Sequence, residues 1–201
     1  YVNINEWMME TGEPPAIIEE DLTEKSAARL KAWYWNNGWF DAETDFEVIP
    51  KKKKRAAVNY FVKPHEPYII DSLTTRIASI AADSIYEAHK FNSAIVPGEQ
   101  YETSDFGLER ERLTSIFRNN GLYHFEQEYI SFEADTVNTD HKVNTAVIIQ
   151  NRQATVDGTP TRIPFKVHKI SRVNIFPDFN FENRNEPVTD TASNEGYHIY
   201  S

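Results

Sequence analysis

The stretch NNGWFDAETDFEV, residues 36–48, has a close counterpart later in the chain, NNGLYHFEQEYISF at residues 119–132. Aligning Gly38 with Gly121 also aligns the apolar residues before them, which recur at spacings of three and four. That spacing predicts a helix with one apolar face before each glycine. The aligned pairs are Leu30 with Leu113, Trp33 with Ile116, and Tyr34 with Phe117.

Each predicted helix ends in Asn-Asn-Gly, with Asn37-Gly38 closing the first copy and Asn120-Gly121 closing the second. Asparagine and glycine are the residues that tolerate the left-handed conformation of a helix C-cap. The repeated context of helix, glycine and strand therefore indicates a duplicated module.

A strand pattern follows the glycine in both copies. The first copy alternates strictly, and the charged run PKKKKR at residues 50–55 then separates it from a second strand, AAVNYFVK, which predicts an antiparallel hairpin. The second copy predicts strands at 122–134 and 142–151. In the first copy Phe40, Ala42, Thr44, Phe46 and Val48 share one face, and Asp41, Glu43, Asp45 and Glu47 share the other.

A third repeat follows each hairpin. PYIIDSL at residues 67–73 aligns with PFKVHKI at 164–170, placing Pro67 over Pro164 and Tyr68 over Phe165. Each such strand is expected to open a new module. The second copy carries extra residues, RQATVDGTPTRI, whose glycine, proline and threonines predict a loop.

The complete module is thus strand 67–77, helix 80–91, helix 104–119, and strands 122–134 and 142–151. We expect three domains: residues 1–64, a module lacking its first strand; residues 65–160, a complete module; and residues 161–201, the start of a third module that is partly irregular. The short helix of the first module is expected in INEWMMETG. The chain begins with Tyr1 rather than Met, so we interpret it as a fragment of a longer precursor.

Composition excludes several function classes. A net charge of −10 argues against a nucleic-acid-binding protein, which needs basic surface to displace counterions from phosphates. The absence of cysteine excludes thiol catalysis, disulfides and thiolate zinc sites. The one basic run, KKKKR, is read as a solvated hairpin turn rather than as a patch for nucleic acid or anionic lipid.

No catalytic constellation stands out. The six histidines lack the spacing of metal ligands, and no phosphate-binding glycine loop or nucleophile elbow is present. We therefore expect no enzyme, no catalytic or metal-binding residues and no cofactor.

The sequences LKAWYWNNGWFDAE and VNYFVKPHEPYIIDSL, together with the order of the module, resemble the POTRA (polypeptide-transport-associated) domains of the BamA/TamA superfamily of outer-membrane proteins. LERERLTSIFRNNGLYHF resembles the same helix signature, and with TGEPP it is most similar to the TamA branch and its lipidated TamL-type proteins, related to surface antigen D15. One departure concerns His65-Glu66, where the family commonly has glycine and a basic residue.

The resemblance implies an α+β fold of tandem POTRA modules (β-α-α-β-β), each a three-stranded mixed sheet covered on one face by two helices. It also implies a periplasmic location at the outer membrane of a Gram-negative bacterium. The expected partners are nascent outer-membrane proteins and a TamB-like protein anchored in the inner membrane. Membrane attachment is expected only through a β-barrel outside this fragment.

In this topology the last strand of a module is central and the strand after Asn-Asn-Gly lies at an edge. An extended client protein could pair with such an edge through its backbone, and acidic side chains there could equally prevent edges from pairing with one another. The second edge is preferred because its apolar residues are expected to be exposed. The candidate edge residues are Phe40, Ala42, Thr44, Phe46, Glu126, Glu128, Ile130 and Phe132.

Two alternatives remain open. One is a POTRA-like adaptor of a cell-division or secretion complex. The other is a carbohydrate-binding or carbohydrate-hydrolysing protein, which would need a deep pocket with converging carboxylates.

Overall fold

The computed structural model describes residues 17–53, 55–177, 181 and 190–200, which include two compact units. The chain passes between these units several times, so each unit combines segments that are distant in sequence. The segment INEWMMETG, expected to form a short helix, lies outside the described residues. The first unit contains Tyr1–Arg76, Asn92–Arg110 and Ser131–Ile148, and the second contains Ile77–Phe91, Glu111–Ile130 and Ile149–Ser201.

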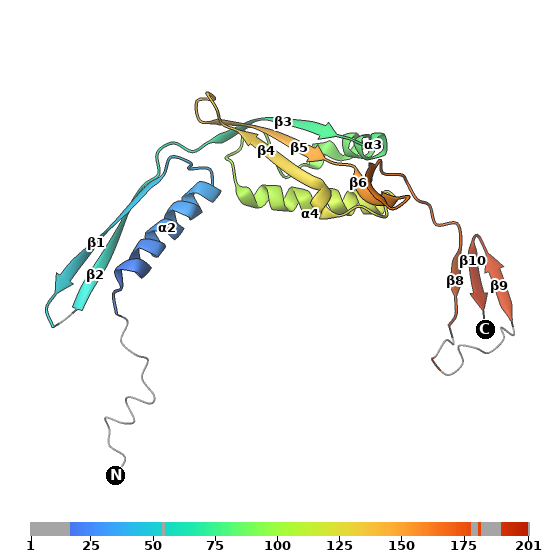
Figure 1. Ribbon diagram of the computed structural model, residues 1–201, viewed down its shortest axis with the longest axis horizontal. Coiled ribbons are helices and arrows are strands. Elements are labelled where there is room, and N and C mark those ends of the chain that lie inside the picture. Colours follow the sequence, from blue (N-terminus) through green and yellow to red (C-terminus); the bar gives the residue numbers. More distant parts are fainter. Residues whose placement is uncertain (1–16, 54, 178–180, 182–189, 201) are drawn as a thin grey trace, which may run out of the picture. The chain divides into compact units, whose positions relative to one another are not determined.

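The first unit contains helix α2 (Glu20–Asn36) and the antiparallel hairpin of β1 (Glu43–Lys51) and β2 (Arg55–Lys63). The helix lies along this hairpin (Figure 1). The predicted turn in the basic run is confirmed, because the chain reverses there with Lys53 in the left-handed region, at a φ of 62°. The predicted alternation is confirmed from Glu43 to Glu47 and fails after it, because Val48, expected on the inner face, is 39% exposed and Ile49 is half-buried. Thr44 is half-buried and donates a hydrogen bond to the carbonyl of Ala27 on α2, whereas the acidic residues of β1 are exposed.

The next five elements follow the expected order of strand, helix, helix, strand, strand, so the α+β class is confirmed. They are β3 (Ile69–Ile77), α3 (Ile80–His89), α4 (Thr103–Asn119), β4 (Ile130–Asp135) and β5 (Lys142–Ile149). Within the sheet the order is β3-β5-β4, which confirms that the last strand is central and the fourth lies at an edge.

Strands β3 and β5 run parallel, because later residues of one contact later residues of the other. Thr145 donates its hydroxyl to the carbonyl of Ser72, and Thr74 donates to the carbonyl of Thr145. Further along both strands, the amide of Ala78 donates to the carbonyl of Ile149. Parallel pairing of this kind needs a long crossover connection, which α3 and α4 supply.

Each unit has its own apolar core. In the first unit Ile70, Ile95 and Phe106 are buried together, and Leu73, Tyr101 and Phe132 pack against them. Residues of β3, α4 and β4 therefore meet on one face of the sheet. In the second unit the core is aromatic, with ring centroids of Phe117 and Phe125 4.5 Å apart and those of Phe125 and Phe165 5.0 Å apart.

The strand expected at 122–134 begins only at Ile130, so the prediction is wrong for residues 122–129. Residues 122–129 instead turn back onto the end of α4 and include a short 3-10 helix, Gln127–Tyr129. The cause is the spacing of the apolar residues there. Leu122 and Phe125 are both fully buried and lie three positions apart, which suits a turn and not the two-residue period of a strand.

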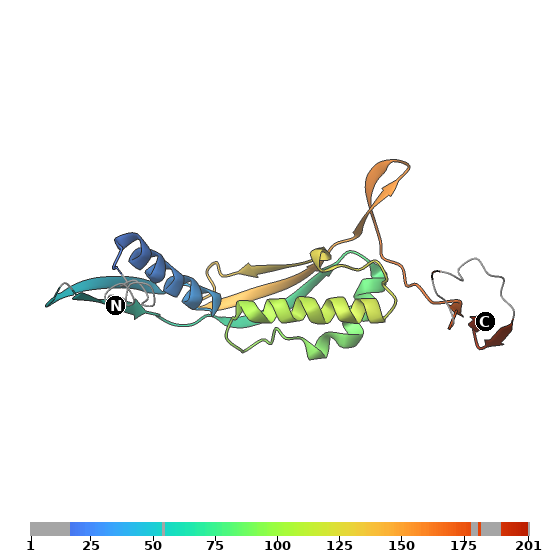
Figure 2. The ribbon, with the colours of Figure 1, turned by 90° about the horizontal axis from the view of Figure 1, so that it is seen from below.

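The prediction of a loop at RQATVDGTPTRI is also wrong. These residues form the antiparallel hairpin of β6 (Arg152–Val156) and β7 (Thr159–Ile163), visible in Figure 2. The hairpin turns at Asp157-Gly158, where both residues have positive φ, 49° and 79°. Asp-Gly is a strong sequence signal for a two-residue hairpin turn. The threonines and the proline around Asp157-Gly158, which are typical of loops, hid this hairpin signal in the sequence.

The end of the chain brings one further correction. Residues 164–170, expected to open a third module as a strand, belong to no described strand, and Phe165 packs into the aromatic core instead. The tail, expected to be partly irregular, includes a three-stranded sheet in the order β8-β10-β9. These strands are β8 (Val173–Ile175), β9 (Thr191–Asn194) and β10 (Tyr197–Tyr200), with β10 parallel to β8 and antiparallel to β9.

Gly38 and Gly121 are points of close backbone approach, and both have positive φ, 86° and 89°. The carbonyl of Gly38 accepts the amide of Tyr68 at 2.8 Å, and the carbonyl of Gly121 accepts the amide of His168 at 2.7 Å. A Cβ on Gly38 would lie 2.6 Å from the carbonyl oxygen of Tyr101, and one on Gly121 would lie 2.7 Å from that of His168.

These two hydrogen bonds define which residues are equivalent in the repeat. His168, and not Phe165, occupies the position of Tyr68, so the alignment of Pro67 with Pro164 is wrong by three residues. The extra β6-β7 hairpin precedes this segment, and the shared proline masked the shift. We call the two places the Gly38 joint and the Gly121 joint, each defined by its glycine and the residue whose amide it accepts.

We predict that Gly38→Ala and Gly121→Ala each lower the free energy of unfolding by at least about 2 kcal/mol, because a Cβ adds both left-handed strain and a clash with a backbone carbonyl. Urea denaturation followed by circular dichroism measures this change.

Two other glycines separate these causes. Gly98 has a φ of 95° with open space around its Cβ position, so Gly98→Ala should cost only about 1 kcal/mol of strain. Gly107 lies exposed in α4, again with open space, so Gly107→Ala should stabilise by up to about 1 kcal/mol. If all four variants lost similar stability, close approach at the joints would not be the cause.

Candidate functional site: the sheet edges

The edge of β1 is the first candidate site, since no described strand pairs with its outer side. Thr44 and Phe46 lie on this strand with their side chains half-buried. Phe40 and Ala42 precede it, which corrects their assignment to the edge. Ala42 is buried, and the ring of Phe40 packs 4.8 Å from Tyr68 and 5.0 Å from Tyr101 at the Gly38 joint.

Backbone groups of alternate residues point to opposite sides of an antiparallel strand. The exposed amide of Phe46 is bound by the side chain of Asp45 at 2.8 Å, and Pro50 has no amide hydrogen. The backbone groups of residues 44, 46, 48 and 50 therefore face away from β2. Among these, the amides of Thr44 and Val48 are open to an added strand, whereas the amide of Phe46 is occupied by Asp45.

The outer face next to this edge is acidic. Glu43 lies at 3.0 Å from His65 Nε2 and at 3.7 Å from Lys63 Nζ. The hydrogen bond from His65, followed by the charge of Lys63, lowers the pKa of Glu43 below its ordinary value. His65 itself has a φ of 59°, in the left-handed region that glycine adopts most readily.

The edge of β4 differs from its prediction in two respects. Glu126 and Glu128 do not lie on it, because the strand begins after them. Ile130 is only 3% exposed, and Phe132 packs against Phe106 at a centroid distance of 5.2 Å, so neither is an exposed apolar residue. This removes the reason for preferring the second edge.

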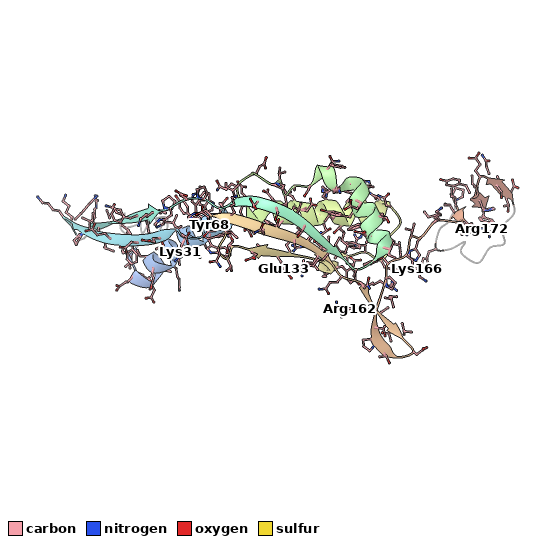
Figure 3. The ribbon with its side chains drawn as sticks, turned by 90° about the horizontal axis from the view of Figure 1, so that it is seen from above. Lys31, Tyr68, Glu133, Arg162, Lys166 and Arg172 are labelled. Atoms are coloured by element: carbon pink, nitrogen blue, oxygen red, sulfur yellow. The ribbon has the colours of Figure 1, made fainter. Side chains whose placement is uncertain are left out.

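The exposed residues of β4 are Glu133, Ala134 and Asp135, so its exposed charges are again acidic. Glu133, labelled in Figure 3, forms an ion pair with Arg76 of β3. The strand is six residues long against nine for β1. Short length and charge both protect an edge against unwanted pairing.

The sequence reasoning missed one edge. Strand β2 is equivalent to the central strand β5, yet no described strand lies on its second side. Tyr60 and Phe61 on β2 are exposed, Phe61 by 53%. The sequence did contain a signal for this open side. The predicted first module lacks the strand that corresponds to β3, which pairs with β5 in the second sheet.

In the described part of the chain, no group of three or more histidine, aspartate or glutamate side chains is placed to hold a metal ion. Among the same residues, no helix has the length and apolar character needed to cross a membrane.

We predict that Phe132→Ala lowers the free energy of unfolding by roughly 2–4 kcal/mol, because it removes a ring packed in the core. Phe61→Ala, at an exposed position of β2, should cost about 1 kcal/mol or less. Thermal or urea denaturation measures both effects. Equal and small losses of stability in the two variants would contradict the packing of Phe132 in the core.

Comparisons with known proteins add structural likenesses only. No protein-family model matches the sequence, and no curated protein does. A crystal structure of BamA from Haemophilus ducreyi lacking POTRA domains 1-3 aligns with a TM-score of 0.44 and 16% identity, covering 75% of this chain and 27% of that one. A crystal structure of Haemophilus influenzae BamA POTRA3-5 aligns with a TM-score of 0.42 and 11% identity, covering 99% and 90%.

Proposed function

We propose that this chain is a periplasmic POTRA region of an outer-membrane β-barrel assembly or translocation protein, and that it docks clients by strand addition without enzymatic chemistry. The order β3-α3-α4-β4-β5 with β5 central supports this proposal, as do the repeated helix, glycine and strand. The signatures LKAWYWNNGWFDAE and VNYFVKPHEPYIIDSL support it too. The clients are nascent outer-membrane proteins.

The finer assignment to the TamA/TamL branch, with a TamB-like partner, belongs to the same proposal. It is supported by TGEPP near the start of the chain and by ERERLTSIFRNNG, which begins in α4 and continues past its end.

The observation that carries the docking proposal is the open edge of β1. Strand addition relies on backbone hydrogen bonds, so it accepts many client sequences, and its strength grows with the length of the pairing. Strand β1 offers nine residues in register with β2, with the amides of Thr44 and Val48 facing outward. Of the two predicted edges we therefore place docking first at β1.

Charge selects which extended segments can dock there. Glu43, Asp45 and Glu47 are exposed in a row on one face of β1. A like charge directly opposite on a neighbouring strand is destabilising, so clients with basic or uncharged residues at alternate positions are favoured.

The open side of β2 is not included in this docking proposal. On the equivalent side of β5 the chain's own β3 supplies the neighbouring strand. A segment of the same protein is the natural occupant of that side in the first module.

An NMR titration of the 15N-labelled chain with a peptide of alternating apolar and basic residues tests the proposal. We expect the amide signals of Thr44, Phe46 and Val48 to shift, because these groups face the added strand. The same peptide with a proline at a central pairing position should bind more weakly. Unshifted signals at 44–48 would remove the support for docking at β1.

A matched pair of variants sharpens this test. Asp45→Ala removes one charge and releases the amide of Phe46, whereas Glu47→Ala removes one charge from the same row without releasing a backbone donor. Asp45→Ala should strengthen peptide binding by about fivefold to tenfold, the worth of one added hydrogen bond, and Glu47→Ala should change it less. Equal effects would mean that charge alone governs the edge.

A further inference from the structure

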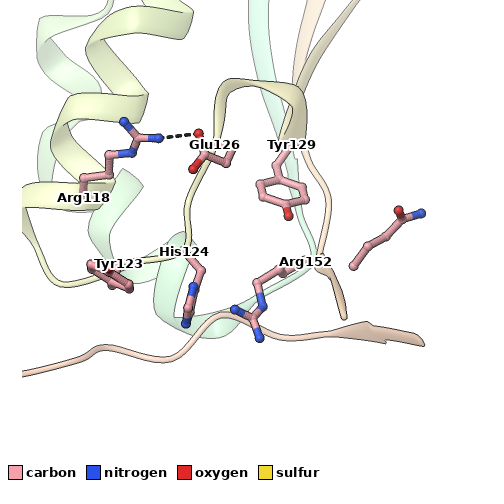
Figure 4. Close-up of a pocket in the computed structure, with 7 residues that line it drawn as sticks. Arg118, Tyr123, His124, Glu126, Tyr129 and Arg152 are labelled. Carbon is pink, nitrogen blue, oxygen red and sulfur yellow. Dashed lines mark hydrogen bonds and ion pairs between the residues drawn. The ribbon is translucent and has the colours of Figure 1, made fainter. Parts of the chain in front are cut away.

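A groove of about 630 Å³ lies at the Gly121 joint within the second unit. Arg118 from the end of α4 and Tyr123, His124 and Tyr129 from the following turn line it, with Arg152 from the start of β6 (Figure 4). A neighbouring hollow of about 360 Å³ shares His124 and Arg152 and adds Lys166 and His168. The two hollows thus meet at one histidine and one arginine.

The groove is positively charged although the whole chain carries a charge of −10. Glu126 is the one acidic residue that lines either hollow, and it forms an ion pair with Arg118, drawn as a dashed line in Figure 4. Arg118 is held further by a hydrogen bond from its Nε to the carbonyl of Phe125 at 2.7 Å. Within the described residues, no acidic side chain pairs with Arg152 or with Lys166, which is labelled in Figure 3.

The Gly38 joint holds a carboxylate at the corresponding position. Asp41 lies three residues after Gly38, as His124 lies three residues after Gly121. Asp41 accepts a hydrogen bond from the hydroxyl of Tyr68 at 3.2 Å and lies 3.6 Å from Nε2 of His141. In the first joint the chain therefore supplies its own carboxylate to the groups around it.

In the Gly121 joint the same two positions hold histidines. His124 replaces Asp41 and His168 replaces Tyr68, and their ring centroids are 5.3 Å apart. An imidazole stands where the first joint has a carboxylate, with Arg152 beside it. The one carboxylate that lines the groove, Glu126, is paired with Arg118 instead.

The ionisation of His124 is consistent with such surroundings. Loss of hydration lowers its pKa, and the nearby charges of Arg152 and His168 lower it further. A negative group bound between these side chains would oppose the last two effects and raise the pKa again.

We propose that the Gly121 joint binds a phosphate group carried by a larger polar molecule, held by Arg152 and Lys166 with the ring nitrogens of His124 and His168. Guanidinium and phosphate match as paired donors and acceptors, and the lysine adds a second fixed charge. The groove is the size of a small-molecule site, so the carrier of the phosphate has room beside Tyr123 and Tyr129.

The phosphate groove and the β1 edge share no residue, so each proposal can fail without the other. Phosphate esters occur both as soluble molecules and as lipid headgroups, and both present the same chemistry to Arg152 and Lys166.

The test is an NMR titration of the whole chain with glycerol phosphate and, separately, sedimentation with phosphatidylcholine vesicles that contain or lack phosphatidic acid. We expect shifts at Tyr123, His124, Arg152 and His168, and a rise in the pKa of His124. Binding of glycerol phosphate in solution assigns the site to soluble esters. Sedimentation only with phosphatidic acid assigns it to a membrane surface. Binding of neither probe overturns the proposal.

Three variants give the test its specificity. Arg152→Gln should weaken binding by about tenfold or more, because it removes a charged donor pair. Lys169→Gln removes the same charge near the groove without lining it and should have little effect. His124→Asp restores the carboxylate of the Gly38 joint, so it should abolish phosphate binding.

Amide signals that stay dispersed show that each variant is folded. Equal losses in Arg152→Gln and Lys169→Gln would show general attraction by a basic surface and would contradict a built site. If His124→Asp did not fold, the comparison of Arg152→Gln with Lys169→Gln still decides the matter.

Discussion

One backbone hydrogen bond organises both joints of this chain: the carbonyl of a glycine just after a helix accepts the amide of a residue from a later segment. The bond from Tyr68 to Gly38 and the bond from His168 to Gly121 are both short, 2.8 and 2.7 Å. Each requires a glycine, because its φ is left-handed and a backbone carbonyl lies within 3 Å of where a Cβ would be. The turn that ends each helix thus also anchors the segment that follows the hairpin.

The same joint carries different chemistry in its two copies. At Gly38 aromatic rings surround Tyr68, and Asp41 completes the hydrogen bonding from within the chain. At Gly121 the equivalent side chains are histidines beside an arginine, and a groove opens there. The two joints therefore share a backbone geometry and differ in their side chains, which is how one fold can hold separate sites.

The order of elements and the central place of β5 could be predicted from the sequence, because helix spacing, Asn-Asn-Gly and strand alternation agree at those places. The strand starting at Ile130 and the hairpin at Asp157-Gly158 were missed where local patterns conflict. Leu122 and Phe125 looked like strand residues although they pack onto the end of α4. The groove could not be predicted, since it depends on His168 replacing Tyr68, and the shared proline concealed that register.

Hydrogen exchange of the two joint amides tests most directly whether a glycine carbonyl fixes each incoming segment. We predict that the amides of Tyr68 and His168 exchange slowly, with protection close to that of Leu122, whose amide is bonded to Phe117 at the end of α4. Exchange of either amide as fast as that of Lys53, in the exposed hairpin turn, would contradict it.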